Sequence, residues 1–292
     1  MKAEVSVVLG SYNRLPFLKA AIRSIRENNI LIPYEILVVD GGSDDGSLDW
    51  LSRQKDIITI VQHNHGEFQG KLLERRSWGY FMNLGFKAAQ GTYLCMISDD
   101  SLLIPNAVMN GIHCIEQAVA QGQRVGAAAF YWRNAWPQDR HFMVSRTVGD
   151  IIFVNHGLYV RSAMEAINWL DETHYQFYCA DIDVCLRMQQ AGYAILAVPD
   201  AYVEHYFHAS VSGREQISPI KDADESIFIQ RWGKEYPELV QGKIVQEPLV
   251  KMYEDPARTG YRLYPRLERL RITLRQFLGK GIRRIQRIVQ GK

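Results

Sequence analysis

Short apolar runs alternate with polar turns and amphipathic stretches along the first part of the chain. Runs with the length and composition of buried strands cover Glu4 to Leu9, Tyr34 to Val39, Ile57 to Gln62, Thr92 to Ile97 and Val125 to Tyr131. Helices are predicted over Pro16 to Asn28, from Ser47, and from Pro105 to about Gln121. This alternation of strands and helices predicts parallel βαβ units and therefore an α/β fold.

Polar residues follow three of these runs at the point where each strand ends. Ser11 to Asn13 follow the first strand, Asp40 ends the second, and Asp99 and Asp100 come just after the fourth. Parallel strands place these ends on one rim, where open α/β sheets bind their ligands. Paired carboxylates there suit a hard divalent cation that carries substrate phosphates. The structural alternative for the pair is a turn and the cap of the next helix.

Composition narrows the class of protein without identifying a function. With 292 residues, 47% of them hydrophobic and 23% charged, the chain has the make-up of an ordinary globular protein with one large core or two smaller ones. It has no apolar run of bilayer length and no basic-then-apolar signal segment at its start, so we expect a cytosolic location. The four cysteines lack CxxC spacing, which favours reduced core residues over a zinc site.

The later part of the chain is less regular. Residues 63 to 82 are predicted to form a loop and a helix that carries Arg75 and Arg76. A helix following Tyr178 is expected to end at Ala191 and Gly192. A strand over Ala194 to Val198 and a further segment over Tyr202 to His208 come next.

The first turn does not fit a dinucleotide or P-loop site. It reads GSYNR, which lacks the GxGxxG pattern, and no Walker sequence occurs elsewhere. The first two turns offer instead the ring of Tyr12, able to stack on a base, and the carboxylate of Asp40, able to accept hydrogen bonds from one.

Taken together and in order, four motifs resemble the family 2 glycosyltransferases of the GT-A fold, which move a sugar from a nucleotide donor to an acceptor. The motifs are VSVVLGSYNR, ILVVDGGSDDG, NLGFKAAQGTYLCMISDDS and YCADIDVCLRMQQAGYAILAVPDAYVEH, and they extend over most of residues 4 to 208. The resemblance implies a Rossmann-like, mostly parallel central sheet flanked by helices. It places the GT-A domain in residues 1–250 and leaves 251–292 as a basic amphipathic helical extension.

The resemblance also implies roles for the residues of the rim. Ser11, Tyr12, Asn13 and Asp40 would bind the nucleotide part of the donor, and Asp99 would contact its ribose or the metal. Asp100 matches the last carboxylate of the DXD-type motif and, with His205, would bind Mg²⁺ or Mn²⁺. The first position of that motif is Ser98, where the family often has Asp.

Asp181 falls where the family has its catalytic base. An inverting transfer needs one base to take the proton of the acceptor hydroxyl, and a partly desolvated Asp can do this. The preceding position is Ala180 in place of the family's Glu. Asp183 is either a further functional acid or a carboxylate that caps the helix.

The donor and the acceptor are defined only broadly. Asp40 suits the N3–H of uracil or thymine and so favours UDP or dTDP, with GDP still open. Arg75 and Arg76 either pair with the diphosphate or are solvated helix residues. In residues 132 to 175, aromatic side chains such as Trp132, Trp136 and Trp169 could stack on sugar rings of a glycan or lipid-linked acceptor.

The end of the chain is strongly basic. Its last 37 residues carry nine Arg and two Lys against a single Glu. Between residues 265 and 290 apolar positions recur every three or four residues. We interpret this stretch either as a helix packed on the domain or as an amphipathic helix on the inner face of the cytoplasmic membrane, as suits cell-envelope polysaccharide synthesis. Nucleic acid is not expected as a partner, because no stacking aromatics interleave with the basic residues.

Two other functions compete with a transferase. A nucleotidyltransferase that makes sugar nucleotides would need a Gly-rich basic first loop, which GSYNR is not. A degenerate domain that binds nucleotide sugars or acts as a scaffold is suggested only by Ala180 and Ser98, and Asp100, Asp181 and His205 argue against it.

Overall fold

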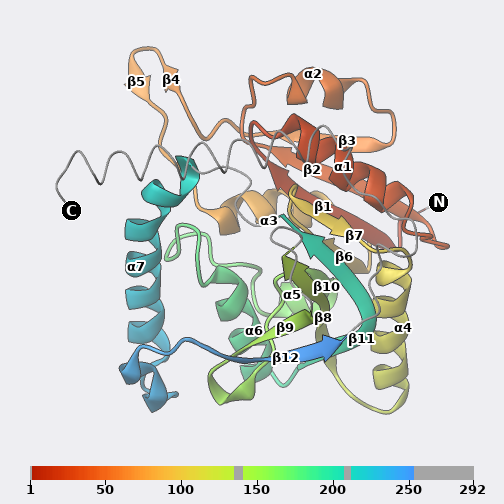
Figure 1. Ribbon diagram of the computed structural model, residues 1–292, viewed down its shortest axis with the longest axis vertical. Coiled ribbons are helices and arrows are strands. Elements are labelled where there is room, and N and C mark those ends of the chain that lie inside the picture. The colour runs from red at the N-terminus through yellow and green to blue at the C-terminus, as the bar shows by residue number, and fades with distance from the viewer. Residues whose placement is uncertain (1, 135–140, 207–211, 253–292) are drawn as a thin grey trace.

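The computed structural model describes residues 2–134, 141–206 and 212–252, and its centre is a curved mixed sheet (Figure 1). Within those residues the sheet has ten strands, whose main path runs β12-β9-β8-β10-β6-β1-β2-β3, with β11 and β7 joined at the side. Helices flank the sheet, as the predicted GT-A fold requires.

One half of the sheet is parallel and contains the predicted βαβ units. β1 pairs in parallel with both β2 and β6, and β2 pairs in parallel with β3. The elements of this half are β1 (Val5–Ser11), α1 (Leu15–Arg26), β2 (Tyr34–Asp40), α2 (Ser47–Ser52), β3 (Ile57–Val61), α3 (Trp78–Ala88) and β6 (Tyr93–Met96). Since Ser11 lies opposite Asp40 in the register, the ends of β1 and β2 share one rim, as expected.

The central strands are apolar on both faces because helices cover both. Val7 belongs to the hydrophobic cluster that includes Ile22 of α1, whereas Val8 belongs to the cluster that includes Phe86 of α3. All four side chains are fully buried. Burial of an aliphatic or aromatic side chain of this size stabilises a fold by about 1.5–3 kcal/mol.

The other half of the sheet is mixed: β11 pairs in parallel with β8, and the remaining pairings are antiparallel. β10 pairs with β6 and β8, and β9 joins β8 to β12, all antiparallel. The elements here are β7 (Ser101–Leu103), α4 (Ala107–Ala120), β8 (Val125–Asn134), β9 (His141–Thr147), η1 (Val148–Asp150), β10 (Gly157–Val160), α5 (Arg161–Ala166), β11 (Ala194–His205), η2 (Pro237–Gln241) and β12 (Val245–Met252). β11 is one strand where two segments were expected, and a register shift between Val198 and Tyr202 marks the interruption.

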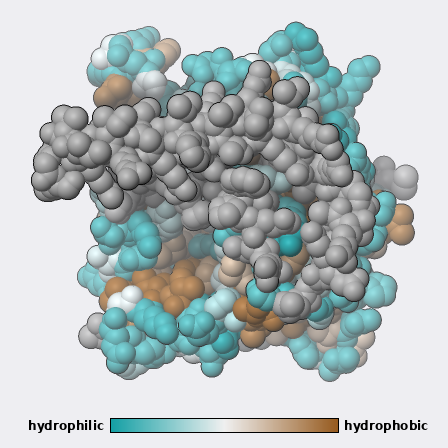
Figure 2. All heavy atoms as spheres, viewed as in Figure 1, coloured by the Kyte–Doolittle hydropathy of each residue, from teal (hydrophilic) through white to brown (hydrophobic). Residues whose placement is uncertain are grey.

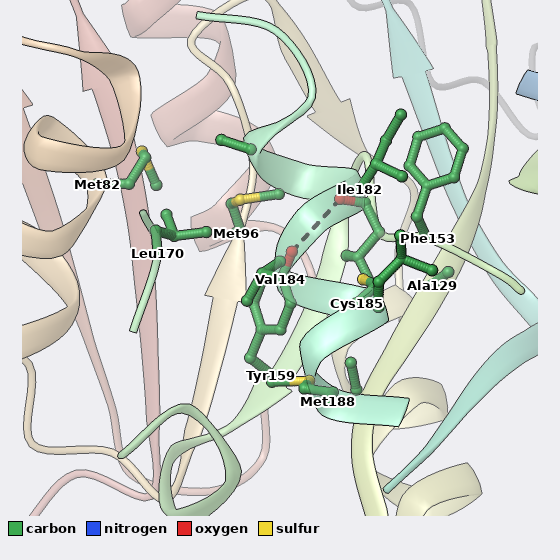
Figure 3. Packing of buried hydrophobic residues seen from close by; sticks show 14 of the residues in the cluster. Met82, Met96, Ala129, Phe153, Tyr159, Leu170, Ile182, Val184, Cys185 and Met188 are labelled. Atoms are coloured by element: carbon green, nitrogen blue, oxygen red, sulfur yellow. Dashed lines mark hydrogen bonds between the residues drawn. The ribbon is translucent and has the colours of Figure 1, made fainter. Parts of the chain in front are cut away.

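α6 (Ala180–Gln190) packs on the core and on α7 (Ser212–Trp232). Figure 3 shows Cys185 and Met188 of α6 among the buried side chains that also include Tyr159. Asp183 is fully buried and accepts hydrogen bonds from Arg187 Nε (2.7 Å), Trp232 Nε1 (3.1 Å) and Tyr175 Oη (3.3 Å). Of the two alternatives for Asp183, these contacts favour a structural role, although the residue joins two helices and does not cap one.

The long segment before α3 differs from the prediction. It forms a hairpin, β4 (Glu67–Phe68) with β5 (Lys71–Leu72), which projects from the fold (Figure 1). The helix begins only at Trp78, because Ser77 Oγ accepts the backbone N–H of Tyr80 as an N-cap. Arg75 and Arg76 therefore precede the helix and do not lie on it, which corrects the expected placement.

The expected C-terminal helix over residues 265–290 and Trp136 lie outside the described residues. Among the helices that the structure does describe, none is both long and apolar enough to span a bilayer. Figure 2 shows hydrophobic atoms gathered on the lower part of one face, on the side where Figure 1 has α7.

Candidate functional site

The two turns that follow β1 and β2 are bonded to each other. The backbone N–H of Asn13 donates to Ser43 Oγ (2.9 Å), and Asn13 Oδ1 accepts the backbone N–H of Asp44 (2.9 Å). Asp45 accepts the backbone N–H of Leu15 (2.8 Å), at the start of α1. These bonds fix the turn that contains Tyr12 against the turn that follows Asp40.

Asp40 is fully buried, and its carboxylate shapes its own turn. Oδ1 accepts the backbone N–H groups of Gly42 (2.8 Å) and Ser43 (2.7 Å), and Oδ2 accepts Ser43 Oγ (2.8 Å). Gly42 has a φ of +88°, and a Cβ there would lie 2.3 Å from His63 Nδ1, so the turn requires glycine. Oδ2 retains a lone pair for a further donor.

The ring of Tyr12 is stacked on the imidazole of His65. Their centroids are 4.1 Å apart and the planes differ by 20°. Burial and the nearby Arg75 lower the pKa of His65, so the ring is neutral near pH 7. The sequence predicts only a loop and a helix for residues 63 to 82, and the fold shows that His65 in this loop lies against Tyr12.

Asp99 and Asp100 are bridged by Arg14. Arg14 Nη1 lies 3.2 Å from Asp99 Oδ1 and 2.9 Å from Asp100 Oδ2, and both carboxylates are 5% exposed. Burial raises the pKa of Asp99 to about 6, although the charge of Arg14 opposes this. Arg14 had been noted only as part of the GSYNR turn. Arg14 follows β1, and Asp99 and Asp100 follow the neighbouring strand β6. This arrangement could have predicted from the sequence that Arg14 lies beside the two carboxylates.

His205 reaches the same carboxylates because β11 pairs with β7. In that antiparallel register His205 lies opposite Ser101, and the backbone N–H of Tyr206 donates to the carbonyl of Asp100 (2.8 Å). His205 Nε2 is 3.4 Å from Asp100 Oδ1. The sequence places the two residues more than 100 positions apart, and the sheet brings them together.

The two carboxylate oxygens of Asp100 face different neighbours. Oδ2 faces Arg14, whereas Oδ1 is buried, makes no hydrogen bond to the described residues and faces the imidazole of His205. Burial would raise the pKa of Asp100, but His205 and Arg14 together hold it well below the usual value. Asp100 is therefore an anion at neutral pH with one oxygen available to a cation.

Asp181 lies in the first turn of α6 and is only partly exposed. Its Oδ1 accepts the backbone N–H of Ile182 (3.0 Å), and its Oδ2 accepts Nδ2 of Asn155 (3.3 Å). Burial raises the pKa of Asp181 to about 6. A carboxyl group with that pKa can take up a proton near neutral pH, as a general base must.

The two parts of the site are connected through β8. Trp132 donates its Nε1–H to Asn155 Oδ1 (3.1 Å), and its ring meets that of His205 edge-on, with centroids 5.7 Å apart. From the sequence, Trp132 is expected only as a ring that stacks on sugars, and no role is expected for Asn155. No local sequence signal marks Asn155, because its partners come from β8 and α6.

Other residues that the sequence suggested for the site do not contact the side chains described above. Trp169 packs against the core, and its carbonyl accepts Arg187 Nη2 (2.8 Å). Arg76 lies over the ring of Tyr80, 5.6 Å from its centroid, and Ala180 is fully buried.

Comparison with known proteins identifies the family and the fold. The family model described as glycosyl transferase family 2 matches residues 6–167, which is more than half of the chain. The fold is similar to that of Staphylococcus aureus TarS residues 1–349, with a TM-score of 0.55 and 13% identity over 78% of this chain and 66% of that one. It is also similar to the mannosyltransferase PcManGT of Pyrobaculum calidifontis, solved with GDP-Man and Mn²⁺, with a TM-score of 0.54 and 16% identity over 79% and 65% of the two chains.

The chain spans very different shares of the curated relatives that it matches. It is 25% identical to the uncharacterized glycosyltransferase YwdF of Bacillus subtilis over 91% of this chain and 99% of that protein. It is 23% identical to the uncharacterized protein y4gI of Sinorhizobium fredii over 75% of this chain, but it spans only 26% of that protein. It is 28% identical to the uncharacterized glycosyltransferase MG060 of Mycoplasma genitalium over 46% of this chain and 42% of that protein. The matched family model and the observed sheet lead to one conclusion: the chain belongs to glycosyl transferase family 2 and has the GT-A fold.

Proposed function

We propose that this protein transfers a sugar, with inversion, from a nucleotide-diphosphate donor to a hydroxyl of a glycan or lipid-linked acceptor. The observation that carries the proposal is the single rim on which Asp99, Asp100 and His205 lie next to the turns of Tyr12 and Asp40, with Asp181 connected to them through Asn155 and Trp132. This continuous group of side chains supports a donor site next to a base.

The residues at Asp100 fit a divalent cation that is shared with the donor. Asp100 Oδ1 and His205 Nε2 would supply one oxygen and one nitrogen, and the described residues contain no group of three His, Cys, Asp or Glu able to hold a metal by themselves. Mg²⁺ and Mn²⁺ at such sites complete their coordination with substrate phosphates and water. The Mn²⁺ in the PcManGT complex supports this choice. When bound, the cation would stabilise the charge on the departing diphosphate.

The remaining rim residues would hold the nucleotide. Arg14 keeps Asp99 and Asp100 in place while leaving Asp100 Oδ1 free to face His205. The lone pair left on Asp40 Oδ2 is the basis for preferring UDP or dTDP, because uracil and thymine present an N3–H donor. In the acceptor half, Asp181 would take the proton of the attacking hydroxyl.

The test is turnover of nucleotide sugars in vitro. Thermal shift against UDP-, dTDP- and GDP-sugars selects the donor, and release of the nucleoside diphosphate is then measured with Mn²⁺ and with EDTA. We expect release, to water or to a supplied acceptor, that EDTA stops. Binding of a nucleotide sugar without any turnover would instead favour the non-catalytic module.

The basic segment at the end of the chain leads to a separate prediction. We propose that residues 265–290 attach the enzyme to an anionic membrane surface that presents a lipid-linked acceptor, since basic residues near such a surface contribute roughly 1 kcal/mol each. The full chain is expected to sediment with anionic liposomes at low salt, and a chain without residues 262–292 to remain in solution. Equal sedimentation of both chains would show that residues 265–290 do not attach the enzyme to the membrane.

A further inference from the structure

The side-chain amide of Asn155 lies between an indole and the carboxylate of Asp181. Trp132 Nε1 is 3.1 Å from Asn155 Oδ1, and Asn155 Nδ2 is 3.3 Å from Asp181 Oδ2. Asn155 is in the segment between β9 and β10, Trp132 is on β8 and Asp181 is on α6, so three separate parts of the fold meet at this amide.

Chemistry fixes which end of the amide faces Asp181. An indole N–H can only donate, so the atom of Asn155 that faces Trp132 must be the carbonyl oxygen. The NH₂ group then faces Asp181, where an ionised carboxylate can only accept. The amide orientation thus follows from its partners, which removes the usual ambiguity between the oxygen and nitrogen of an Asn side chain.

We propose that Asn155 is the residue that positions Asp181 for catalysis, and that the indole N–H of Trp132 keeps its amide turned so that it donates. The inference rests on the proposed function, in which Asp181 is the base. The backbone N–H of Ile182 holds Oδ1 (3.0 Å) and Asn155 holds Oδ2, so each carboxylate oxygen has one fixed donor. A donor on Oδ2 favours the ionised form and also sets the direction in which the remaining lone pairs point.

Other ionisable groups near Asp181 do not titrate in the same range. The groups that interact with its charge are Tyr159 on β10, Cys179 before α6 and Cys185 on α6. Burial raises the pKa of all three, that of Cys185 to about 12. Burial lowers the pKa of His156, next to Asn155, to about 3, so this imidazole is neutral as well. Asp99 of the donor site also has a pKa of about 6, but its carboxylate pairs with Arg14, whereas Asn155 bonds to Asp181. A shift of the acidic limb that follows substitution of Asn155 is therefore assigned to Asp181.

The arrangement offers a substitution that separates the hydrogen bond from the packing. Trp132→Phe keeps an aromatic ring against His205 but removes the Nε1–H, so the amide of Asn155 is free to turn its oxygen toward Asp181. Asn155→Ala removes the donor altogether. A matched control is Trp50→Phe, because Trp50 lies on α2, where its half-buried ring packs on the cluster that includes Ile22 and lies 5.7 Å from Lys19 Nζ.

The experiment is the pH dependence of kcat for the wild type, Trp132→Phe, Asn155→Ala, the double variant and the control. Loss of a hydrogen bond to a carboxylate raises its pKa, so the acidic limb of the profile should move upward by about one unit in each single variant, a tenfold change in proton affinity. The double variant should show no further shift, since both changes remove the same bond. Trp50→Phe should keep the wild-type limb, and the donor affinity of every variant should stay within about threefold of wild type.

The outcomes separate the inference from the function on which it rests. A wild-type enzyme with no turnover at any pH would defeat the proposed function. An active wild type whose acidic limb is unchanged by Trp132→Phe and Asn155→Ala would overturn the role of Asn155 alone. If Asn155→Ala does not fold, as judged by its thermal melting, the acidic limb of Trp132→Phe decides whether Asn155 positions Asp181. The ¹³C signal of the Asp181 carboxyl group reports its pKa without any need for activity.

Discussion

Asp181→Asn is expected to lower sugar transfer by about two to four orders of magnitude, the usual contribution of a general base. Asparagine has nearly the same shape as aspartate, so it can still accept the backbone N–H of Ile182, but it cannot take up the proton of an acceptor hydroxyl. Donor binding should be preserved, because the proposed nucleotide and metal residues lie on other elements of the rim.

The pH dependence of wild-type transfer provides a second readout of the same residue. Burial places the pKa of Asp181 at about 6, so the carboxylate gains a proton and the rate falls as the pH drops through that value. The contribution of Asp181 to the acidic limb should be absent from the residual activity of Asp181→Asn, which keeps only the pH dependence of Asp99 at the donor site. Asp49→Asn on α2, whose carboxylate pairs with Arg53 on the surface (2.8 Å), is the control that should behave as wild type. A fully active Asp181→Asn enzyme would show that the base lies elsewhere.

Asp100→Ala is expected to remove the divalent-metal dependence of donor binding while leaving the fold intact. Arg14 keeps Asp99 as a partner in this variant, so no cation is left without a neighbouring carboxylate. The loss in metal-dependent affinity should be at least the 10- to 100-fold that removal of an outer-shell partner costs at metal sites.

Calorimetric titration of the donor nucleotide with Mn²⁺ and with EDTA measures this effect. For the wild type the two affinities should differ, and for Asp100→Ala they should be equal. Asp56→Ala, which removes a surface carboxylate paired with Arg26 (2.6 Å), should retain the difference. A folded Asp100→Ala protein with the wild-type response to Mn²⁺ would take Asp100 out of the metal site.

The local pattern of apolar and polar residues was sufficient to predict the parallel half of the sheet. The apolar runs that end in Ser11 and Asp40 could be read as neighbouring strand ends, because parallel βαβ units leave little choice about where those ends lie. The pairing of β7 with β11, which puts His205 beside Asp100, is a contact between distant parts of the chain. Only the family resemblance, and no periodicity, suggested it.

The residues that sequence analysis missed are those whose partners are distant in the chain. Arg14 meets Asp99 across 85 positions, and Asn155 meets Trp132 and Asp181 across 23 and 26. The helix α7 was not predicted at all. It contains Pro219 and has no clear amphipathic stripe, so its contacts with the core at Phe228 and Trp232 decide its conformation.

The stack of His65 on Tyr12 has a kinetic consequence. Two rings 4.1 Å apart have no space for a third between them, since a sandwiched ring needs roughly 7 Å. A base that is to lie on that face of Tyr12 must wait until His65 leaves it. Under the proposed role of Tyr12, nucleotide entry would have two steps, opening and capture, and the apparent dissociation constant would exceed the intrinsic one by the reciprocal of the open fraction. The observed rate of binding should accordingly level off at high donor concentration, at a value set by the departure of His65.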